Sequence, residues 1–290
     1  MTRDQHLEHR IRVRAPEAGE SSPSTRGHVL PGEQPPPPFE ARRPSDYLLR
    51  AAASAAGQAY KSLAIQQLAI DADDTILDLG CGTGGELATL LRALGPDGSL
   101  IGIDTDDDAL RVARERFDDR RLRLRSGDAH ALDLADESVD RVYVDRAAQH
   151  FAAPATVLDD LRRILRPDGR VVLAEPDWQT LVIDSTEPEL AANYRRFVVD
   201  QVIRNPRIGS ELPRLVQVAG LRLDTVLPAT ATFTDPVDAD QVFGFARVTR
   251  RAVAAGYLDD DQADRWLGSL TGGLFFASLT IFITVAHRGG

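Results

Sequence analysis

The residues of this chain best suited to chemistry lie between Thr75 and Glu86, in the segment TILDLGCGTGGE. An apolar run with one acid, Asp78, is followed by closely spaced glycines and then by the helical pattern ELATLLRAL. This order predicts a buried parallel strand, a tight loop and a helix N-terminus, where backbone N–H groups receive polar or anionic ligands. We therefore expect a nucleotide-like cofactor here. Gly80, Gly82 and Gly85 also fit the dinucleotide pattern GxGxxG, so this segment alone leaves the cofactor open.

Two acidic residues bear on the choice of cofactor. Asp78 lies inside the first strand, where a dinucleotide-binding fold usually has an apolar residue, and a buried carboxylate there needs a polar or cationic partner. Asp104 ends the next apolar run, LIGID, where a carboxylate can accept hydrogen bonds from both ribose hydroxyls. Asp104 therefore indicates a ribose without selecting between cofactors.

Strands and helices alternate along the rest of the chain. The patterns predict strands at 75–79, 99–103, 121–125, 139–144 and 169–175, and helices at 85–94, 107–117 and 154–166. Further helices are predicted at 188–203, 209–219, 235–255 and 259–270, with one long strand, or two broken at Pro228, over 221–233 and a final strand at 278–287. This alternation is typical of a parallel sheet covered on both faces. We expect the last two strand segments to close the sheet as an antiparallel pair.

Changes in composition predict the domain organisation. Residues 1–44 contain PGEQPPPPFEARRP and few periodic apolar positions, so we expect a disordered, Pro-rich N-terminal extension. The rest of the chain, residues 45–290, is predicted to form a single domain. Its predicted parts are N-terminal cap helices at 45–72, a cofactor-binding core at 73–180, and a helical substrate lid with closing strands at 181–290.

Charge and composition restrict the partners. A formal charge of −10 over 290 residues argues against nucleic acid or an anionic membrane as the main partner, because both attract basic faces. Cys81 is the only cysteine, so an internal disulfide is impossible and a metal site is not expected. The N-terminus lacks the apolar core of a secretory signal. We expect a cytoplasmic, bacterial protein that acts on a small molecule, and a homodimer is compatible with the sequence.

Four sequence blocks in a fixed order resemble class I S-adenosylmethionine-dependent methyltransferases of the small-molecule type, similar to the type 11 and type 25 domains. The blocks are ILDLGCGTGGEL, LIGIDTD, SGDAHALDLADESVDRVYV and LRRILRPDGRVVLAEPDW. The resemblance as a whole covers roughly residues 45–180. The resemblance implies an α/β, Rossmann-like fold with a mostly parallel sheet of seven strands, an antiparallel last strand, and helices on both faces. It also implies S-adenosylmethionine as the cofactor.

The resemblance further implies which residues meet each part of this cofactor. The methionine end is expected beside the glycine loop and the fourth strand, the ribose at the end of the second strand, and the adenine beside SGDA. The implied residues are, in that order, Asp78, Gly80, Cys81, Gly82, Asp145 and Arg146, then Asp104 and Thr105, then Gly127, Asp128 and Ala129. Carboxylates such as Asp78 suit the ammonium and sulfonium groups of this cofactor, whereas NAD requires a pyrophosphate cradle.

Catalytic candidates lie after the fourth and fifth strands, because chemistry in an open α/β sheet gathers beyond the carboxyl ends of strands. His150 is a candidate general base, since its pKa lies near neutrality, and a packed structural histidine is the alternative. Asp177 follows the fifth strand and is expected to face the acceptor. A base is required only when the acceptor must lose a proton.

Aromatic residues are candidates for binding the acceptor, although aromatic residues at helical spacing also fill plain cores. The candidates are Tyr47, Tyr60, Trp178 and Tyr194. Lys61 is the only lysine of the chain. Because arginine replaces lysine throughout this sequence, we attribute that uniqueness to coding bias and predict a solvated helix face for Lys61.

The function predicted from these features is methyl transfer from S-adenosylmethionine to an oxygen, nitrogen or carbon atom of a small, partly apolar metabolite, in secondary metabolism. One alternative keeps the fold and the cofactor but catalyses a cyclisation or a decarboxylation. A further alternative is an NAD(P)-dependent oxidoreductase.

Overall fold

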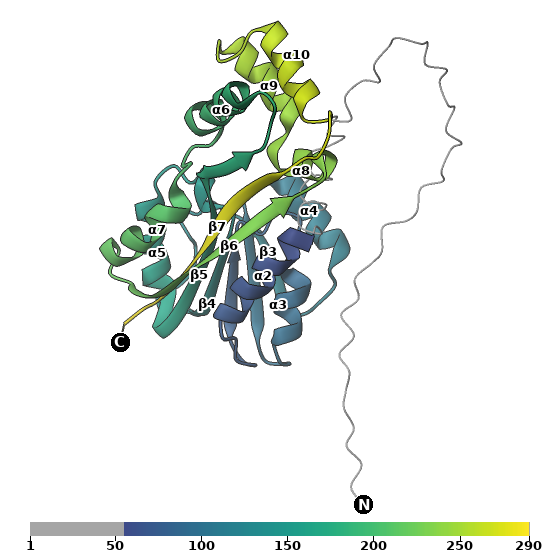
Figure 1. The fold of residues 1–290 in the computed structure, drawn as a ribbon. Helices are drawn as coiled ribbons and strands as arrows, with labels where there is room; N and C mark the ends of the chain where they lie inside the picture. The colour runs from purple at the N-terminus through teal and green to yellow at the C-terminus, as the bar shows by residue number, and fades with distance from the viewer. Residues whose placement is uncertain (1–54, 290) are drawn as a thin grey trace, which may run out of the picture.

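A computed structural model describes residues 55–289, which form a seven-stranded sheet with helices on both faces (Figure 1). The strand order is β3-β2-β1-β4-β5-β7-β6, and β7 runs antiparallel to both of its neighbours while the other strands are parallel. This architecture confirms the predicted fold class. Tyr47 and the predicted extension at residues 1–44 lie outside the described residues.

The elements of the first half lie close to their predicted positions. The strands are β1 (Thr75–Leu79), β2 (Ser99–Asp104), β3 (Leu122–Ser126), β4 (Val139–Asp145) and β5 (Leu165–Ile183). The helices are α2 (Ala55–Gln67), α3 (Leu87–Ala93), α4 (Asp107–Arg116), the short 3₁₀ helix η1 (Ala148–His150) and α5 (Pro154–Ile164). Asp106 caps α4, because its side chain accepts a hydrogen bond from the Ala109 N–H.

The predicted end of β5 at residue 175 is wrong, because the strand continues to Ile183. It pairs with β7 (Ala277–His287) as far as Asp177 opposite Thr280 and pairs again at Val182. Pro176 is tolerated inside the strand because the pairing with β4 stops at Ala174, so that β5 beyond this point has a neighbour on one side only.

The second half confirms most of the predicted helices. They are α6 (Pro188–Phe197), continued by one π-helical turn, η2 (Val198–Val202), then α7 (Ile208–Val218), α8 (Pro236–Phe243), α9 (Phe245–Ala254) and α10 (Asp260–Ser269). The single helix predicted at 235–255 is wrong, since Gly244 has a left-handed backbone with φ 65° and separates α8 from α9. Of the two alternatives for residues 221–233, one long strand is observed, β6 (Arg222–Phe233). Its Pro228 is accommodated because β6 is an edge strand.

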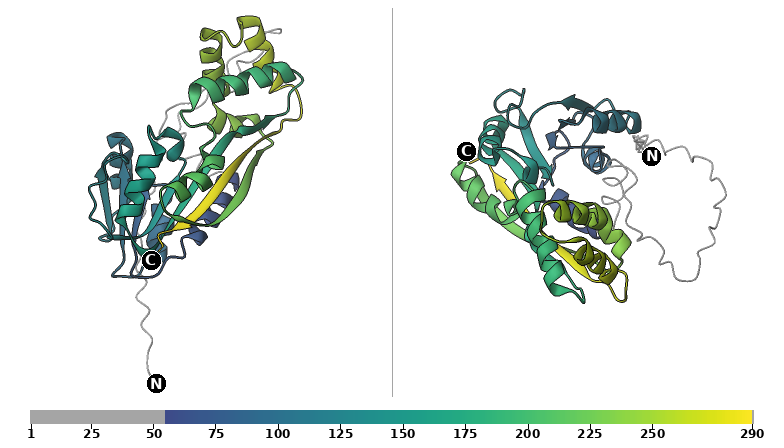
Figure 2. Two further views of the ribbon diagram at one scale, coloured as in Figure 1. Left: turned by 90° about the vertical axis from the view of Figure 1, so that its left-hand side faces the viewer. Right: turned by 90° about the horizontal axis from the view of Figure 1, so that it is seen from above.

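Two apolar layers cover the sheet, and a third apolar core lies apart from them. Strand β1 supplies both layers, with Leu77 facing one and Ile76 the other. The third core joins the extended ends of β5 and β7 to α6, α8, α9 and α10, with Trp266 fully buried inside it. Figure 2 shows these helices beyond one end of the sheet. This is the region of the predicted lid, whose role in acceptor binding stays a prediction.

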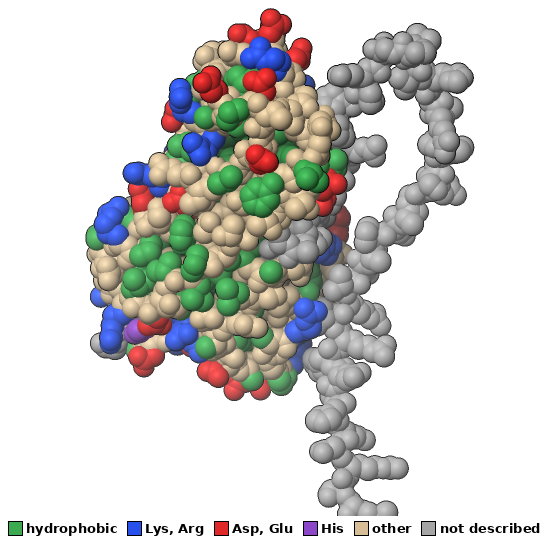
Figure 3. Space-filling view, in the orientation of Figure 1, with side chains coloured by type: hydrophobic (Ala, Val, Ile, Leu, Met, Phe, Trp, Pro, Cys, Tyr) green, Lys and Arg blue, Asp and Glu red, His purple; other side chains and the backbone are tan. Residues whose placement is uncertain are grey.

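Two general features concern the described part of the chain as a whole. Among residues 55–289, no helix is long and apolar enough to cross a membrane. On the face drawn in Figure 3, acidic and basic side chains are interspersed.

The close packing of α7 on β5 predicts opposite effects for two Gly→Ala changes in helices. A Cβ at Gly209 would lie 2.6 Å from the Glu175 carbonyl oxygen, so Gly209→Ala should lower the free energy of unfolding by about 1 to 3 kcal/mol. At Gly268 in α10 a Cβ meets nothing within 4 Å, so Gly268→Ala should raise it by up to about 1 kcal/mol. Urea denaturation measures both, and shifts of the same sign would contradict this packing.

Candidate functional site

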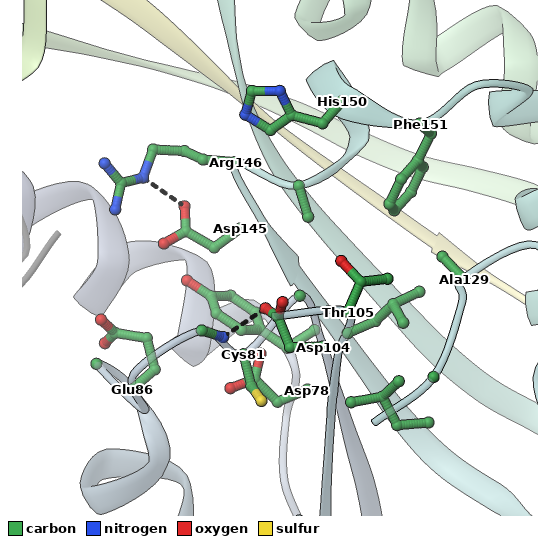
Figure 4. Close-up of a pocket in the computed structure, with 18 of the residues that line it drawn as sticks. Asp78, Cys81, Glu86, Asp104, Thr105, Ala129, Asp145, Arg146, His150 and Phe151 are labelled. Atoms are coloured by element: carbon green, nitrogen blue, oxygen red, sulfur yellow. Dashed lines mark hydrogen bonds and ion pairs between the residues drawn. The ribbon is translucent and has the colours of Figure 1, made fainter. Parts of the chain in front are cut away.

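A cavity of about 430 Å³ opens at the carboxyl ends of β1, β2 and β4 (Figure 4). The chain order reverses here, because β1 lies between β2 and β4, and ligands of open α/β sheets bind at such a switch point. Every residue predicted to contact the cofactor lines this cavity: Asp78, Gly80, Cys81, Gly82, Asp104, Thr105, Gly127, Asp128, Ala129, Asp145 and Arg146.

The glycine loop brings backbone close to the cavity in a conformation that side chains disfavour. Gly80 has φ 81°, and a Cβ on it would lie 2.5 Å from the Ala147 Cβ. The Gly80 N–H donates to the Ile103 carbonyl oxygen at 2.8 Å, which ties the loop to the end of β2. Helix α3 begins at Leu87, and Gly85 and Glu86, which directly precede it, line the cavity.

Asp104 is held at the centre of the cavity by the loops on either side of it. Its Oδ2 accepts from the Gly82 N–H at 2.7 Å and its Oδ1 from the Asp106 N–H at 2.9 Å. A carboxylate has about four acceptor positions, so each oxygen can accept one more hydrogen bond from a ligand. This geometry suits a pair of ribose hydroxyls.

Asp128 lies at the exposed rim. Its Oδ1 accepts from the His130 N–H at 2.9 Å and lies 2.6 Å from the His130 Nδ1. The His130 Nε2 accepts from the Ala153 N–H, so the Nδ1 carries the proton and donates to Asp128. These hydrogen bonds lower the pKa of Asp128. The carboxylate is therefore ionised and oriented at the rim.

A cluster of carboxylates occupies the opposite end of the cavity from Ala129 (Figure 4). Asp78, Glu86 and Asp145 line this end. Burial, followed by the charges of Glu86 and Asp145, raises the pKa of Asp78 well above its usual value. Grouped carboxylates in a buried site favour a cationic ligand, since a cation relieves their mutual repulsion.

The phenol of Tyr143 lies at the same end of the cavity. It is fully buried, and its hydroxyl has no hydrogen-bond partner among the described residues. Its pKa is raised by burial first and then by the nearby charge of Asp145. A buried hydroxyl without a partner is costly, so this cavity wall has hydrogen-bonding capacity that a ligand can satisfy.

The comparisons with known proteins agree with this geometry. A family model described as a methyltransferase domain matches residues 70–220, just over half of the chain. An uncharacterised 37.1 kDa protein of a Streptomyces fradiae transposon is 43% identical over 252 residues, which cover 86% of this chain and 73% of that protein. This chain belongs to the class I S-adenosylmethionine-dependent methyltransferases.

Two further comparisons cover the core and the fold. The demethylmenaquinone methyltransferase of Lactobacillus johnsonii is 33% identical over 119 residues, 40% of this chain and 49% of that enzyme, so the match spans about half of this relative. A candidate methyltransferase from Bacillus halodurans has a TM-score of 0.60 at 17% identity, covering 79% of this chain and 98% of the solved one. The second likeness shows the shared fold.

The prediction of a solvated face for Lys61 in this methyltransferase is wrong. Lys61 is only 4% exposed and lines the cavity, and its Nζ donates to Glu86 and lies 3.4 Å from the Asp145 Oδ2. The neighbouring Tyr60 does not line the cavity itself, but its hydroxyl donates to Asp145 at 3.0 Å. Helix α2 thus reaches the site through two consecutive side chains.

Glu175 positions the segment that follows β4. It is fully buried, and its carboxyl group accepts from the N–H groups of Ala147 at 2.8 Å, Ala148 at 2.7 Å and Gln149 at 3.2 Å. Burial raises its pKa to about 8, whereas these three donors act in the opposite direction. Because η1 begins at Ala148, Glu175 fixes the helix that presents His150.

His150 lies at the exposed mouth of the cavity, beside Arg146 and Phe151 (Figure 4). Partial burial and the positive charges of Arg146 and Arg204 lower its pKa. The neutral imidazole, which is the form that accepts a proton, is therefore favoured at neutral pH. Its catalytic role stays a prediction.

Three other predicted residues lie away from the cavity lining. Asp177 is buried, and its carboxylate accepts from the Gln179 N–H. Trp178 belongs to the third core, and its Nε1 donates at 2.8 Å to Gln149, which does line the cavity. Tyr194 is fully buried in the same core, with its hydroxyl donating to the Phe243 carbonyl oxygen. Direct contact of these residues with an acceptor stays a prediction.

Sequence reasoning missed several polar residues of the cavity wall, among them Lys61, Glu86, Tyr143 and Gln149. Two carried a usable signal, since Lys61 is the only lysine and Glu86 directly follows the glycine loop. Tyr143 reads as an ordinary strand residue, and only the tertiary structure shows that its hydroxyl reaches the carboxylate cluster.

The contacts of Glu175 predict a graded loss of stability. Glu175→Ala leaves the three N–H groups around the start of η1 without their acceptor, so it should lower the free energy of unfolding by about 2 to 4 kcal/mol. Glu175→Gln keeps an oxygen of the same shape and should cost less. Chemical denaturation compares the two variants, and equal losses would refute this role for the carboxyl oxygens.

Proposed function

We propose that this methyltransferase binds S-adenosylmethionine in the cavity and transfers the methyl group to an oxygen, nitrogen or carbon atom of a small, partly apolar metabolite in bacterial secondary metabolism. The observation that carries the proposal is the cluster of Asp78, Glu86 and Asp145 at one end of a cavity whose centre holds Asp104. A cationic group attached to a ribose satisfies both parts at once.

The residues present fit this cofactor along its whole length. Figure 4 shows Ala129 at one end of the cavity, Asp104 between, and Glu86 with Asp145 at the other end. Adenine would therefore lie beside Ala129 and Asp128, the ribose on Asp104, and the methionine portion at the carboxylate cluster. When bound, the cofactor supplies an electrophilic methyl group on its sulfonium.

The chain's own contribution is to hold the acceptor close and in line, and to limit water around it. The mouth of the cavity offers the apolar ring of Phe151 beside the neutral imidazole of His150. Phe151 supports a partly apolar acceptor. His150 would accept a proton where the acceptor has one to lose.

Other features support a small acceptor, and the single cysteine, Cys81, is compatible with a reducing cytoplasm. The net charge of −10 disfavours nucleic acid as a partner. The relative from Lactobacillus johnsonii is, by its name, a demethylmenaquinone methyltransferase, which supports a small-molecule acceptor here as well.

The proposal is tested by titrating the protein with S-adenosylmethionine, S-adenosylhomocysteine and NAD(P), and by incubating it with methyl-labelled cofactor and a bacterial extract. We expect both adenosyl ligands to bind, and label to pass to a small molecule as S-adenosylhomocysteine forms.

Asp104→Ala should weaken binding of S-adenosylmethionine more than tenfold, because it removes the acceptor of two ribose hydroxyls. Asp108→Ala, an exposed acid on α4, is the matched control. Binding of NAD(P) alone, or product formation without S-adenosylhomocysteine, would overturn the proposal.

The raised pKa of Asp78 predicts a pH dependence of binding. In the free protein the raised pKa lets Asp78 keep its proton to a higher pH than an ordinary Asp, and a cationic ligand favours the carboxylate, so binding should release protons. Affinity for S-adenosylhomocysteine should then increase as pH rises through the raised pKa of Asp78, by at most about tenfold per pH unit for each proton released. Asp78→Asn should flatten this dependence, because it removes the titrating group.

Calorimetry in buffers of different ionisation enthalpy measures the protons released. Protons released by the ligand itself are the same for wild type and Asp78→Asn, so they cancel when the two proton counts are subtracted. The same pH slope in wild type and Asp78→Asn would exclude Asp78 as the source.

A further inference from the structure

Four side chains of alternating charge line one end of the cavity. Lys61 donates to Glu86 and lies 3.4 Å from Asp145, and the Arg146 Nε lies 3.8 Å from the other oxygen of Asp145. All four line the cavity, and Figure 4 shows Glu86, Asp145 and Arg146 grouped at this end. The order of charges is negative, positive, negative, positive.

Such an array is complementary to a zwitterion more than to a simple cation. An α-amino acid group carries an ammonium and a carboxylate a few ångströms apart, and each needs a partner of opposite sign when it leaves water. Glu86 and Asp145 offer acceptors for the ammonium. The carboxylate of the ligand needs a cation at the same end.

Lys61 suits that second task. Its ammonium is compact and has three donors, one of which is directed to Glu86, it lies 3.4 Å from the Asp145 Oδ2, and Lys61 lines the cavity. A cation buried to 4% exposure is retained only with strong partners, and its helix α2 is anchored beside it by the hydrogen bond from Tyr60 to Asp145. The position of the ammonium is therefore well defined.

We propose that Lys61 binds the carboxylate of the cofactor's amino-acid end, and that the Glu86–Lys61–Asp145 array makes this site select ligands with an intact α-amino acid group. This inference rests on the proposed cofactor site. It assigns to α2 a direct part in cofactor recognition, through the single lysine of the chain.

The test compares two ligands and two proteins. S-Adenosylhomocysteine has the amino-acid group, and 5′-methylthioadenosine has the same nucleoside without it. Lys61→Met should weaken S-adenosylhomocysteine binding by about tenfold to a hundredfold, the usual effect of losing a hydrogen bond between charged groups. Binding of 5′-methylthioadenosine should change by less than about threefold, because that ligand does not reach Lys61.

Arg111→Met is the matched control, since it removes one positive charge from an exposed position on α4 outside the cavity lining. It should leave both affinities unchanged. Equal weakening of both ligands by Lys61→Met would show a merely structural role and overturn the inference. Failure of wild type to bind either ligand would instead refute the proposed cofactor site, so the two failures are distinguishable.

A second measurement serves if Lys61→Met does not fold. Acetylation of the wild-type protein modifies one lysine side chain, at residue 61, and peptide mass spectrometry follows its rate. S-Adenosylhomocysteine should slow this reaction, whereas 5′-methylthioadenosine at saturation should not. Equal protection by both ligands, or by neither, would overturn the inference.

Discussion

The mutual repulsion of carboxylates at the end of the sheet is the constraint around which the site is organised. Asp78, Asp104 and Asp145 end or nearly end three adjacent strands, and Glu86 follows the glycine loop. Like charges gathered in a partly buried space are unfavourable unless cations or hydrogen-bond donors compensate them. Each neighbouring element supplies such a group. Helix α2 supplies the Lys61 ammonium and the Tyr60 hydroxyl, and the loop supplies the Gly82 N–H.

This compensation is incomplete in the protein alone, and that is what makes the cavity a binding site. Burial and neighbouring charge raise the pKa of Asp78, and the Tyr143 hydroxyl has no partner among the described residues. A ligand with a cationic group and hydrogen-bonding groups can neutralise the carboxylates and pair with the Tyr143 hydroxyl. The same unfavourable charge that costs folding free energy therefore becomes affinity and specificity.

The long pairing of β5 with β7 links this site to the rest of the molecule. Glu175, on β5, holds the N–H groups that begin η1, while the continuation of both strands forms the third core with α6, α8, α9 and α10. Gln149 joins the two, because it lines the cavity and accepts a hydrogen bond from Trp178 in that core. A change in the packing of the helical region can thus reach the mouth of the cavity through one hydrogen bond.

Local sequence patterns by themselves determined the fold class, most element positions and the place of the glycine loop and its neighbouring acids, because apolar periodicity, glycine position and strand-end acids are properties of short segments. Asp78 and Asp104 were predicted from such patterns, Asp128 was implied by the resemblance to class I methyltransferases, and all three line the cavity. The tertiary structure alone decided the partners of these residues. Lys61 was predicted on a solvated helix face, yet long-range packing buries it against Glu86 and Asp145. Likewise, β5 continues past Pro176 because it pairs there only with β7, a strand about a hundred residues away in sequence, after its pairing with β4 has stopped at Ala174. Contacts between distant segments depend on how the elements pack, and no local pattern records that packing.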